Sequence, residues 1–237
     1  MSLEPSAISK PNFTHEAANR ELDERGLTAF TNPSASALGD FFARLDDRWR
    51  GNPFERGFQE LTPTCRAAAR PGSLSSFTGA GAQPMHTDAA YLASPPRYLV
   101  FECVDPGEVT CKTEAWVTNQ TKLLEERPHL LTDPTWVFLG GGRSRFYSPV
   151  LDTVLGIARI RYDPCCMSAA GENKTTLNEV SGLLASYTRQ VSFEWTLGAF
   201  FIIDNWRCMH ARGVGGESAP SRRLRRWYLG AQNGLGI

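Results

Sequence analysis

Short runs of β-branched and aromatic residues, separated by glycine, proline and aspartate, recur from about residue 97 to residue 230. Each run has about the length of one strand, and the residues between the runs favour tight turns. Many short strands with few helices predict an antiparallel double-sheet fold, mainly β, with helices covering one sheet. We expect strands at 97–104, 109–117, 135–139, 144–150, 157–162, 191–195, 199–204 and 224–230.

Four segments show helical features instead. Thr14 is a suitable N-cap for a first helix that ends at Gly26. In 35–49, apolar residues recur at spacings of three and four, which predicts an amphipathic helix lying on the core. The other expectations are a helix capped by Thr118 or Asn119 that ends at Glu126, a helix at 175–190, short strands at 28–30 and 74–77, and a loop with one turn of helix at 51–73.

Composition narrows the class of protein. A chain of 237 residues, 41% of them hydrophobic, can bury a sizeable core as one domain. The 25 basic and 25 acidic residues balance to a formal net charge of +0, which argues against nucleic acid as a partner. The start has no basic segment before an apolar run, and no apolar stretch is long enough to span a membrane, so we expect a cytoplasmic protein without a membrane partner. The six cysteines form no CxxC pair and are expected to be reduced thiols.

Two histidines and an aspartate form a candidate metal site. In an extended segment, residues two apart point to the same face, so His86 and Asp88 can bind one ion, with His210 as a third ligand. Two histidines and one carboxylate suit Fe(II), because they leave positions for a bidentate co-substrate and O2. An HxD tripeptide alone is weak support, since most such tripeptides bind no metal.

The flanking sequences carry a resemblance. The stretches 86–91, 95–98, 204–212 and 221–226 resemble the taurine dioxygenase and clavaminate synthase group of Fe(II)/2-oxoglutarate oxygenases, over about residues 74 to 230. The resemblance implies a double-stranded β-helix (jelly-roll) core at 74–230, within a single oxygenase domain spanning 1–237. It also implies a helical N-terminal segment at 1–73 packed on that core, inserted helices, and iron held by His86, Asp88 and His210.

The same resemblance implies a binding site for 2-oxoglutarate. In that group, a threonine about 27 residues after the first histidine and an arginine about a dozen after the second bind the far carboxylate of 2-oxoglutarate. Thr113 and Arg222 occupy these positions. Thr110 is an alternative to Thr113, because residues 109–112 lack the glycine-rich sequence that usually precedes this threonine in that group. Arg223 is an alternative to Arg222, because the two arginines are adjacent.

Strand alternation puts Arg222 and Arg226 on one face and Arg223 with Trp227 on the other, without choosing between them. Members of that group place a second substrate-facing residue four positions after the 2-oxoglutarate arginine, so the resemblance favours Arg222 with Arg226.

The resemblance implies an enzyme that uses Fe(II), 2-oxoglutarate and O2, with succinate and CO2 as co-products. Because Asp88 keeps the carboxylate ligand, hydroxylation, desaturation or cyclisation is expected rather than halogenation. Arg226 and Arg212 would suit a small anionic metabolite, such as an amino acid or a biosynthetic intermediate of a natural-product pathway. The alternatives are a zinc-dependent hydrolase using the same three ligands, and a β-sandwich binding module without catalysis.

Overall fold

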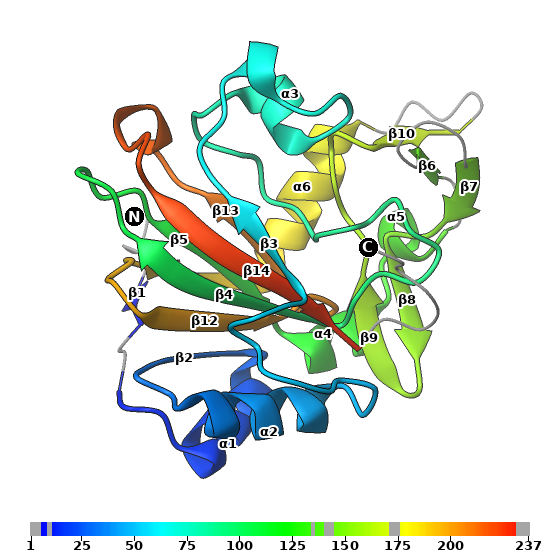
Figure 1. Ribbon diagram of the computed structural model, residues 1–237. Helices are drawn as coiled ribbons and strands as arrows, with labels where there is room; N and C mark the ends of the chain where they lie inside the picture. The colour runs from blue at the N-terminus through cyan, green and yellow to red at the C-terminus, as the bar shows by residue number, and fades with distance from the viewer. Residues whose placement is uncertain (1–5, 9–10, 134–135, 140–144, 171–175, 231–237) are drawn as a thin grey trace.

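Two mainly antiparallel sheets form the centre of the molecule in the computed structural model, which describes residues 6–8, 11–133, 136–139, 145–170 and 176–230 (Figure 1). The first sheet has the order β2 (Leu27–Thr31), β12 (Ala199–Asp204), β4 (Tyr98–Asp105), β14 (Arg223–Leu229) and β3 (Phe58–Leu61). The second has the order β1 (Ser6–Ala7), β11 (Thr188–Phe193), β5 (Thr113–Thr118) and β13 (Cys208–Arg212). Strands distant in sequence are therefore neighbours in both sheets.

β12 shows why the sheets stack. All six of its residues are buried, and they alternate between two apolar clusters. Ala199, Phe201 and Ile203 face the second sheet, whereas Phe200 and Ile202 face the helices. The ring of Phe201 stacks on Phe193 of β11, with ring centroids 4.6 Å apart and an interplanar angle of 7°. A strand that is apolar on both faces must be covered on both, which makes β12 a central strand.

Replacing Phe201 by alanine is expected to lower the free energy of unfolding by about 3 to 5 kcal/mol, because a fully buried aromatic ring leaves a cavity between two rigid sheets. Denaturant unfolding of the variant against wild type measures the change. Phe77→Ala, at an exposed aromatic residue, serves as the control and should change stability by much less. A loss below about 1 kcal/mol for Phe201→Ala would contradict this packing.

Two helices cover the outer face of the first sheet (Figure 1). α1 (His15–Arg25) is capped by Thr14 and ends at Gly26, as predicted. α2 (Ala35–Leu45) packs Leu38, Phe41 and Phe42 on the sheet, but it ends four residues earlier than predicted. The reason is local, because the carboxylate of Asp46 accepts hydrogen bonds from the main chain and side chain of Arg48 and thereby competes with the helix.

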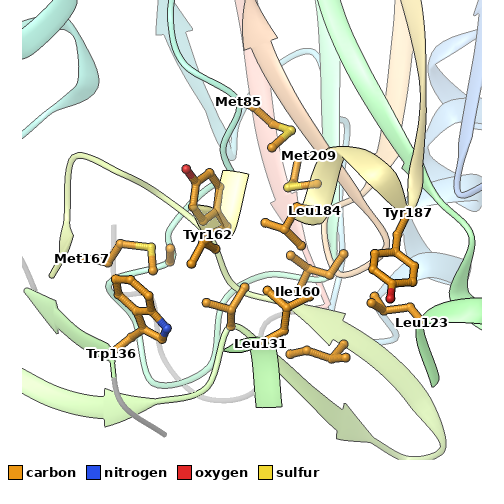
Figure 2. Packing of buried hydrophobic residues seen from close by; sticks show 14 of the residues in the cluster. Met85, Leu123, Leu131, Trp136, Ile160, Tyr162, Met167, Leu184, Tyr187 and Met209 are labelled. Carbon is orange, nitrogen blue, oxygen red and sulfur yellow. The ribbon is translucent and has the colours of Figure 1, made fainter. Parts of the chain in front are cut away.

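A third apolar cluster holds the segments inserted between β5 and β11 (Figure 2). It joins the second sheet to α4 (Gln120–Glu126), α5 (His129–Thr132), α6 (Leu177–Ser186) and two small sheets. The small sheets contain β10 (Met167–Ala169), β6 (Trp136–Leu139) and β7 (Arg145–Ser148), and the hairpin β8 (Leu151–Val154) with β9 (Ile157–Ile160). Figure 2 shows Met85 and Met209 beside each other at the edge of this cluster.

Several predicted elements differ from those observed. Residues 74–77 are helical in α3 (Leu74–Thr78) rather than a strand, whereas the turn of helix expected within 51–73 is observed as a 3-10 helix (Arg66–Ala68). β3 lies within the segment predicted to be loop. The predicted helix 175–190 ends at Ser186, because Thr188 to Gln190 pair with β5. The predicted strand 144–150 is shorter and is followed by β8, and residues 135, 144 and 175 lie outside the described residues.

Two further expectations concern the whole chain. All six cysteines lie in described segments and are free thiols. Among the helices of the described residues, none combines the length and the apolar character needed to cross a membrane.

Candidate metal centre

Two histidines from distant segments face each other. His86 and His210 form an isolated antiparallel bridge, in which each main-chain N–H donates to the other's carbonyl, at 3.0 and 2.8 Å. Residues directly opposed in an antiparallel pair project to the same face, so the two imidazoles lie side by side with ring centroids 4.4 Å apart. The preceding Met85 and Met209 pack in the cluster of Figure 2. This backbone pairing is what positions the two candidate ligands.

Asp88 completes the group. The chain is extended through Thr87 and then turns, with Ala89 at a positive φ of 57°. The turn places Oδ1 of Asp88 3.4 Å from Nε2 of His86 and 3.7 Å from Nε2 of His210. Adjacent ligands of an octahedral ion with bonds of about 2.1 Å lie about 3.0 Å apart, so these donors could bind one ion with small adjustments. Within the described residues, this is the cluster of His, Cys, Asp or Glu side chains that could hold a metal.

The electrostatics of the site keep two of the three candidate ligands deprotonated. Burial opposes ionisation of Asp88, but the charge of Arg226 and the two neighbouring imidazoles outweigh it and hold the pKa of Asp88 far below its usual range. Burial and the neighbouring His86 lower the pKa of His210 to about 3. Burial also favours the neutral form of His86, but the hydrogen bond and charge of Asp88 raise its pKa. Metal ligands must be deprotonated, and Asp88 and His210 are held in that state.

The imidazole of His86 is also oriented. Its Nδ1 lies 2.9 Å from the carbonyl oxygen of Pro84, which accepts a hydrogen bond when Nδ1 carries the proton. That tautomer leaves the lone pair of Nε2 directed toward Asp88 and His210. The ring of His210 is held differently, by an aromatic contact with Phe101 at 5.7 Å between centroids.

Asn205 fixes the main chain of Asp88. Its side-chain oxygen accepts from the N–H of Asp88 at 2.8 Å, and its amide nitrogen donates to the carbonyl of Asp88 at 3.0 Å. The same nitrogen donates to the carbonyl of Pro96 at 3.0 Å. Asn205 is fully buried, so these bonds form away from water. One side chain thus ties the turn of the aspartate ligand to the segment that leads to β13.

Replacing Asn205 by alanine is expected to weaken metal binding about 10- to 100-fold, the usual effect of removing a group that orients a ligand. It should also cost about 1 to 3 kcal/mol of stability, because main-chain groups of Asp88 lose their buried partner. Anaerobic Fe(II) titration and denaturant unfolding measure the two effects. Asn119→Ala is the control: it removes the cap of α4 and should lower stability without changing metal affinity. If both variants bound Fe(II) with the same affinity, Asn205 would not position Asp88 for metal binding.

Arg161 holds the segment that follows Asp88. Its guanidinium donates to the carbonyls of Ala90, Leu92 and Ala93 and stacks against the ring of Phe146. Burial lowers the pKa of this arginine to about 10. A buried cation bonded to three carbonyl oxygens stabilises one path of the loop, which supports the position of the aspartate from its other side.

The second oxygen of Asp88 is bound by a separate pair of residues. Nη1 of Arg226 lies 2.7 Å from Oδ2, and the hydroxyl of Tyr228 donates to the same oxygen at 3.3 Å. Nη2 of Arg226 donates to the side chain of Gln59, on β3, at 2.7 Å. With Oδ2 held, Oδ1 is left for a metal, so the carboxylate is arranged to bind through one oxygen. The guanidinium predicted to meet substrate therefore contacts a candidate metal ligand in this structure.

A second group of buried side chains lies at or next to the ends of β5, β11 and β14. Arg222, Thr113, Cys111 and Trp195, which we call the Arg222 cluster, are all at least nine-tenths buried. Nη1 of Arg222 donates to the sulfur of Cys111 at 3.3 Å, and Nε has no hydrogen-bond partner. The indole N–H of Trp195 donates to the hydroxyl of Thr113 at 3.0 Å. Among the described residues, no carboxylate forms an ion pair with Arg222, and burial lowers its pKa.

The rival residues lie elsewhere. Thr110 and Arg223 are both exposed. Thr113 and Ala115 share one face of β5, and Ala115 is directly opposite His210. At a rise of about 3.3 Å per residue, Thr113 lies about 7 Å along the strand from the position opposite His210. The threonine and arginine at the predicted spacings are thus the buried ones, on the face that carries a candidate metal ligand.

Arg212 has a different environment. Its Nε donates to the carbonyl of Gly81 at 2.8 Å, and its Nη2 donates to the carbonyl of Gly79. These bonds hold the glycine-containing loop that leads to His86. The contacts of Arg212 are main-chain contacts, and its predicted role toward substrate remains a prediction.

Neither a protein-family model nor a curated protein matches the sequence, but solved structures match the fold. One is asparagine oxygenase in complex with Fe(II), 2S,3S-3-hydroxyasparagine and succinate, with 12% identity, 91% of this chain and 77% of that chain covered, and a TM-score of 0.64. Another is the non-heme iron oxygenase OrfP in complex with Fe and alpha-ketoglutaric acid, with 16% identity, coverage of 92% and 79%, and a TM-score of 0.63. This chain has the fold of these oxygenases. The predicted jelly-roll architecture is confirmed.

A third match has the same fold. PvcB, an Fe, alpha-ketoglutarate dependent oxygenase from an isonitrile synthetic pathway, is 18% identical, with 92% of this chain and 80% of that chain covered and a TM-score of 0.56. Within this fold, several residues that shape the present site were not singled out by sequence. Asn205 lies in a stretch that carried the resemblance, so its position was a signal. Trp195, Tyr228 and Gln59 had no such signal, because their partners are distant in sequence.

Proposed function

We propose that this protein is an Fe(II)/2-oxoglutarate-dependent oxygenase. The observation that carries the proposal is Arg222, a buried guanidinium without a carboxylate partner among the described residues, in one cluster with the hydroxyl of Thr113. A buried charge without a partner is costly, so a site that retains one is built for an anionic ligand. A zinc-dependent hydrolase would have no use for this arrangement.

The residues fit the two groups that such an enzyme needs. His86, Asp88 and His210 would hold iron, and Arg222 with Thr113 would bind the far carboxylate of 2-oxoglutarate. The separation of about 7 Å along β5 is on the scale of a five-carbon dicarboxylate. Iron with 2-oxoglutarate and O2 supplies the oxidative decarboxylation that yields succinate and CO2 and oxidises a C–H bond of the substrate.

The protein's own side chains bind, orient and exclude water. Burial of Arg222 and Thr113 removes water that would compete for the carboxylate. Arg226 and Tyr228 hold Oδ2 of Asp88, so that only Oδ1 is offered to a metal. Ligation through one oxygen of Asp88 would leave coordination positions free for the co-substrates.

We propose a small anionic metabolite as substrate, with hydroxylation as the outcome. The asparagine oxygenase structure contains 3-hydroxyasparagine, and a further structure of OrfP contains (3S)-hydroxy-L-Arg, which supports an amino acid or a related acid. Arg226 and Arg212 stay the cations predicted from the sequence for such a substrate, although in this structure Arg226 binds Asp88 and Gln59 and Arg212 binds main-chain carbonyls. A single domain spanning 1–237, a cytoplasmic location and the lack of nucleic-acid and membrane partners stay predictions from the sequence.

The test is an anaerobic titration of the metal-free protein with Fe(II) and then with 2-oxoglutarate. Chelation of iron by 2-oxoglutarate produces a weak visible charge-transfer band, and we expect that band to saturate with 2-oxoglutarate. Exposure of the complex to air should then release succinate. If no band forms and zinc binds instead, the hydrolase becomes the better assignment.

A further inference from the structure

Trp195 contacts both groups assigned to the 2-oxoglutarate carboxylate. It lies two residues beyond the end of β11 and is buried between the two sheets. Its indole N–H donates to Oγ1 of Thr113 at 3.0 Å. The guanidinium carbon of Arg222 lies 5.9 Å from the centroid of the same ring. The proposed chemistry at the metal does not require a tryptophan at this position. The two contacts therefore suggest a role in binding the co-substrate.

The hydrogen bond to Thr113 decides where the hydroxyl proton can go. An indole N–H can only donate, whereas a hydroxyl has one proton and two lone pairs. Because Oγ1 accepts from Trp195, its own proton is directed away from the indole. A threonine that accepts in this way is prepared to donate to a carboxylate beside Arg222.

The indole itself is held rigidly. Phe193 contacts it edge to face at 4.6 Å between centroids, and Phe101 and Phe201 contact it at 6.4 Å. Phe101 in turn contacts the ring of His210 at 5.7 Å. An aromatic group fixed on several sides has few rotamers available, so the direction of its N–H is set by the fold.

We propose that Trp195 is a positioning residue for the co-substrate, which orients the hydroxyl of Thr113 and supports the guanidinium of Arg222 so that both meet the far carboxylate of 2-oxoglutarate. The inference rests on the proposed function. It assigns no catalytic step to Trp195, which acts through Thr113 and Arg222.

The test is a double-mutant cycle on 2-oxoglutarate affinity, measured by the charge-transfer band under anaerobic conditions. Trp195→Phe keeps an aromatic ring beside Arg222 but removes the N–H. We expect it to weaken 2-oxoglutarate binding about 5- to 30-fold, as for loss of one oriented hydrogen bond to a charged group. In a Thr113→Val background, the same change should alter affinity by less than about twofold, because the hydroxyl it orients is gone.

A structural role alone predicts a different result. If Trp195 only supported the core, Trp195→Phe would weaken binding equally with and without Thr113, and that additivity would overturn the proposal. Unchanged affinity in the single variant would overturn it as well. Trp227→Phe is the matched control, since Trp227 is buried and its N–H donates to the carbonyls of Pro53 and Arg56 on the helix-covered face. It should lower stability without changing 2-oxoglutarate affinity.

The two hypotheses fail in distinguishable ways. If wild-type protein gives no band, the proposed function is wrong, and the role of Trp195 is wrong with it. If wild type gives the band and the cycle is additive, the oxygenase assignment stands and only the positioning role of Trp195 is rejected.

Discussion

Replacing Arg222 by alanine is expected to remove most of the affinity for 2-oxoglutarate while leaving the unliganded fold intact. Truncating one partner of a buried charge pair typically costs about 2 to 5 kcal/mol, which corresponds to about 30-fold to several thousand-fold in affinity. In the unliganded protein Arg222 has a thiol as its hydrogen-bond partner and no ion pair among the described residues. Deleting a buried charge that has no ion-pair partner breaks no ion pair, so it does not destabilise the fold in that way and can stabilise it.

The measurement is the anaerobic titration of the Fe(II)-loaded variant with 2-oxoglutarate, together with denaturant unfolding of the metal-free protein. Arg223→Ala is the matched control, because Arg223 is the adjacent arginine and is exposed. We expect the control to bind 2-oxoglutarate like wild type. If Arg223→Ala lost affinity for 2-oxoglutarate and Arg222→Ala retained it, then Arg223 and not Arg222 would bind the far carboxylate.

Replacing His210 by alanine is expected to abolish stabilisation of the protein by Fe(II). A ligand at 100 times its dissociation constant stabilises the native state by about 2.7 kcal/mol. For a chain of this size that corresponds to a rise in Tm of about 5 to 10 °C. The variant retains only two of the three donors, and its metal-induced shift should fall to near zero. The unliganded fold should change little, because the ring nitrogen Nδ1 of His210 has no hydrogen-bond partner to lose.

Anaerobic thermal unfolding with and without Fe(II) provides the measurement, and addition of a chelator to the wild-type complex should reverse the shift. His129→Ala is the control, since His129 is exposed at the start of α5 and distant in sequence from all three ligands. A full Fe(II)-induced shift in His210→Ala would show that the metal binds at another site.

The candidate site residues were singled out by the family resemblance together with residue type, since the HxD pattern alone was weak support. His86, Asp88 and His210 are polar residues in apolar surroundings, at positions where a buried polar group needs a partner. The same holds for Thr113 and Arg222. The alternative residues Thr110 and Arg223 are exposed. The spacing in the resemblance favoured Thr113 and Arg222 over them but did not exclude them.

The errors in secondary structure occurred where tertiary pairing outweighs local preference. β3 carries only four residues with weak alternation, and it is a strand because its register with β14 satisfies its main chain. That register also brings Gln59 to Arg226, so the N-terminal segment contributes a side chain to the site. The helix predicted to reach residue 190 stops at Ser186 for the same reason, since its last residues pair with β5.

Sequence by itself determined the β-rich architecture, the cap of α1 and the residue types of the candidate site, because turn preference, periodicity and side-chain chemistry are local properties. Tertiary structure alone decided that His86 and His210 form mutual main-chain hydrogen bonds. It also decided that Arg226 holds Asp88 and that Trp195 lies between Thr113 and Arg222. Alternation along a strand tells which face a side chain takes, but its partner depends on the register between segments more than a hundred residues apart.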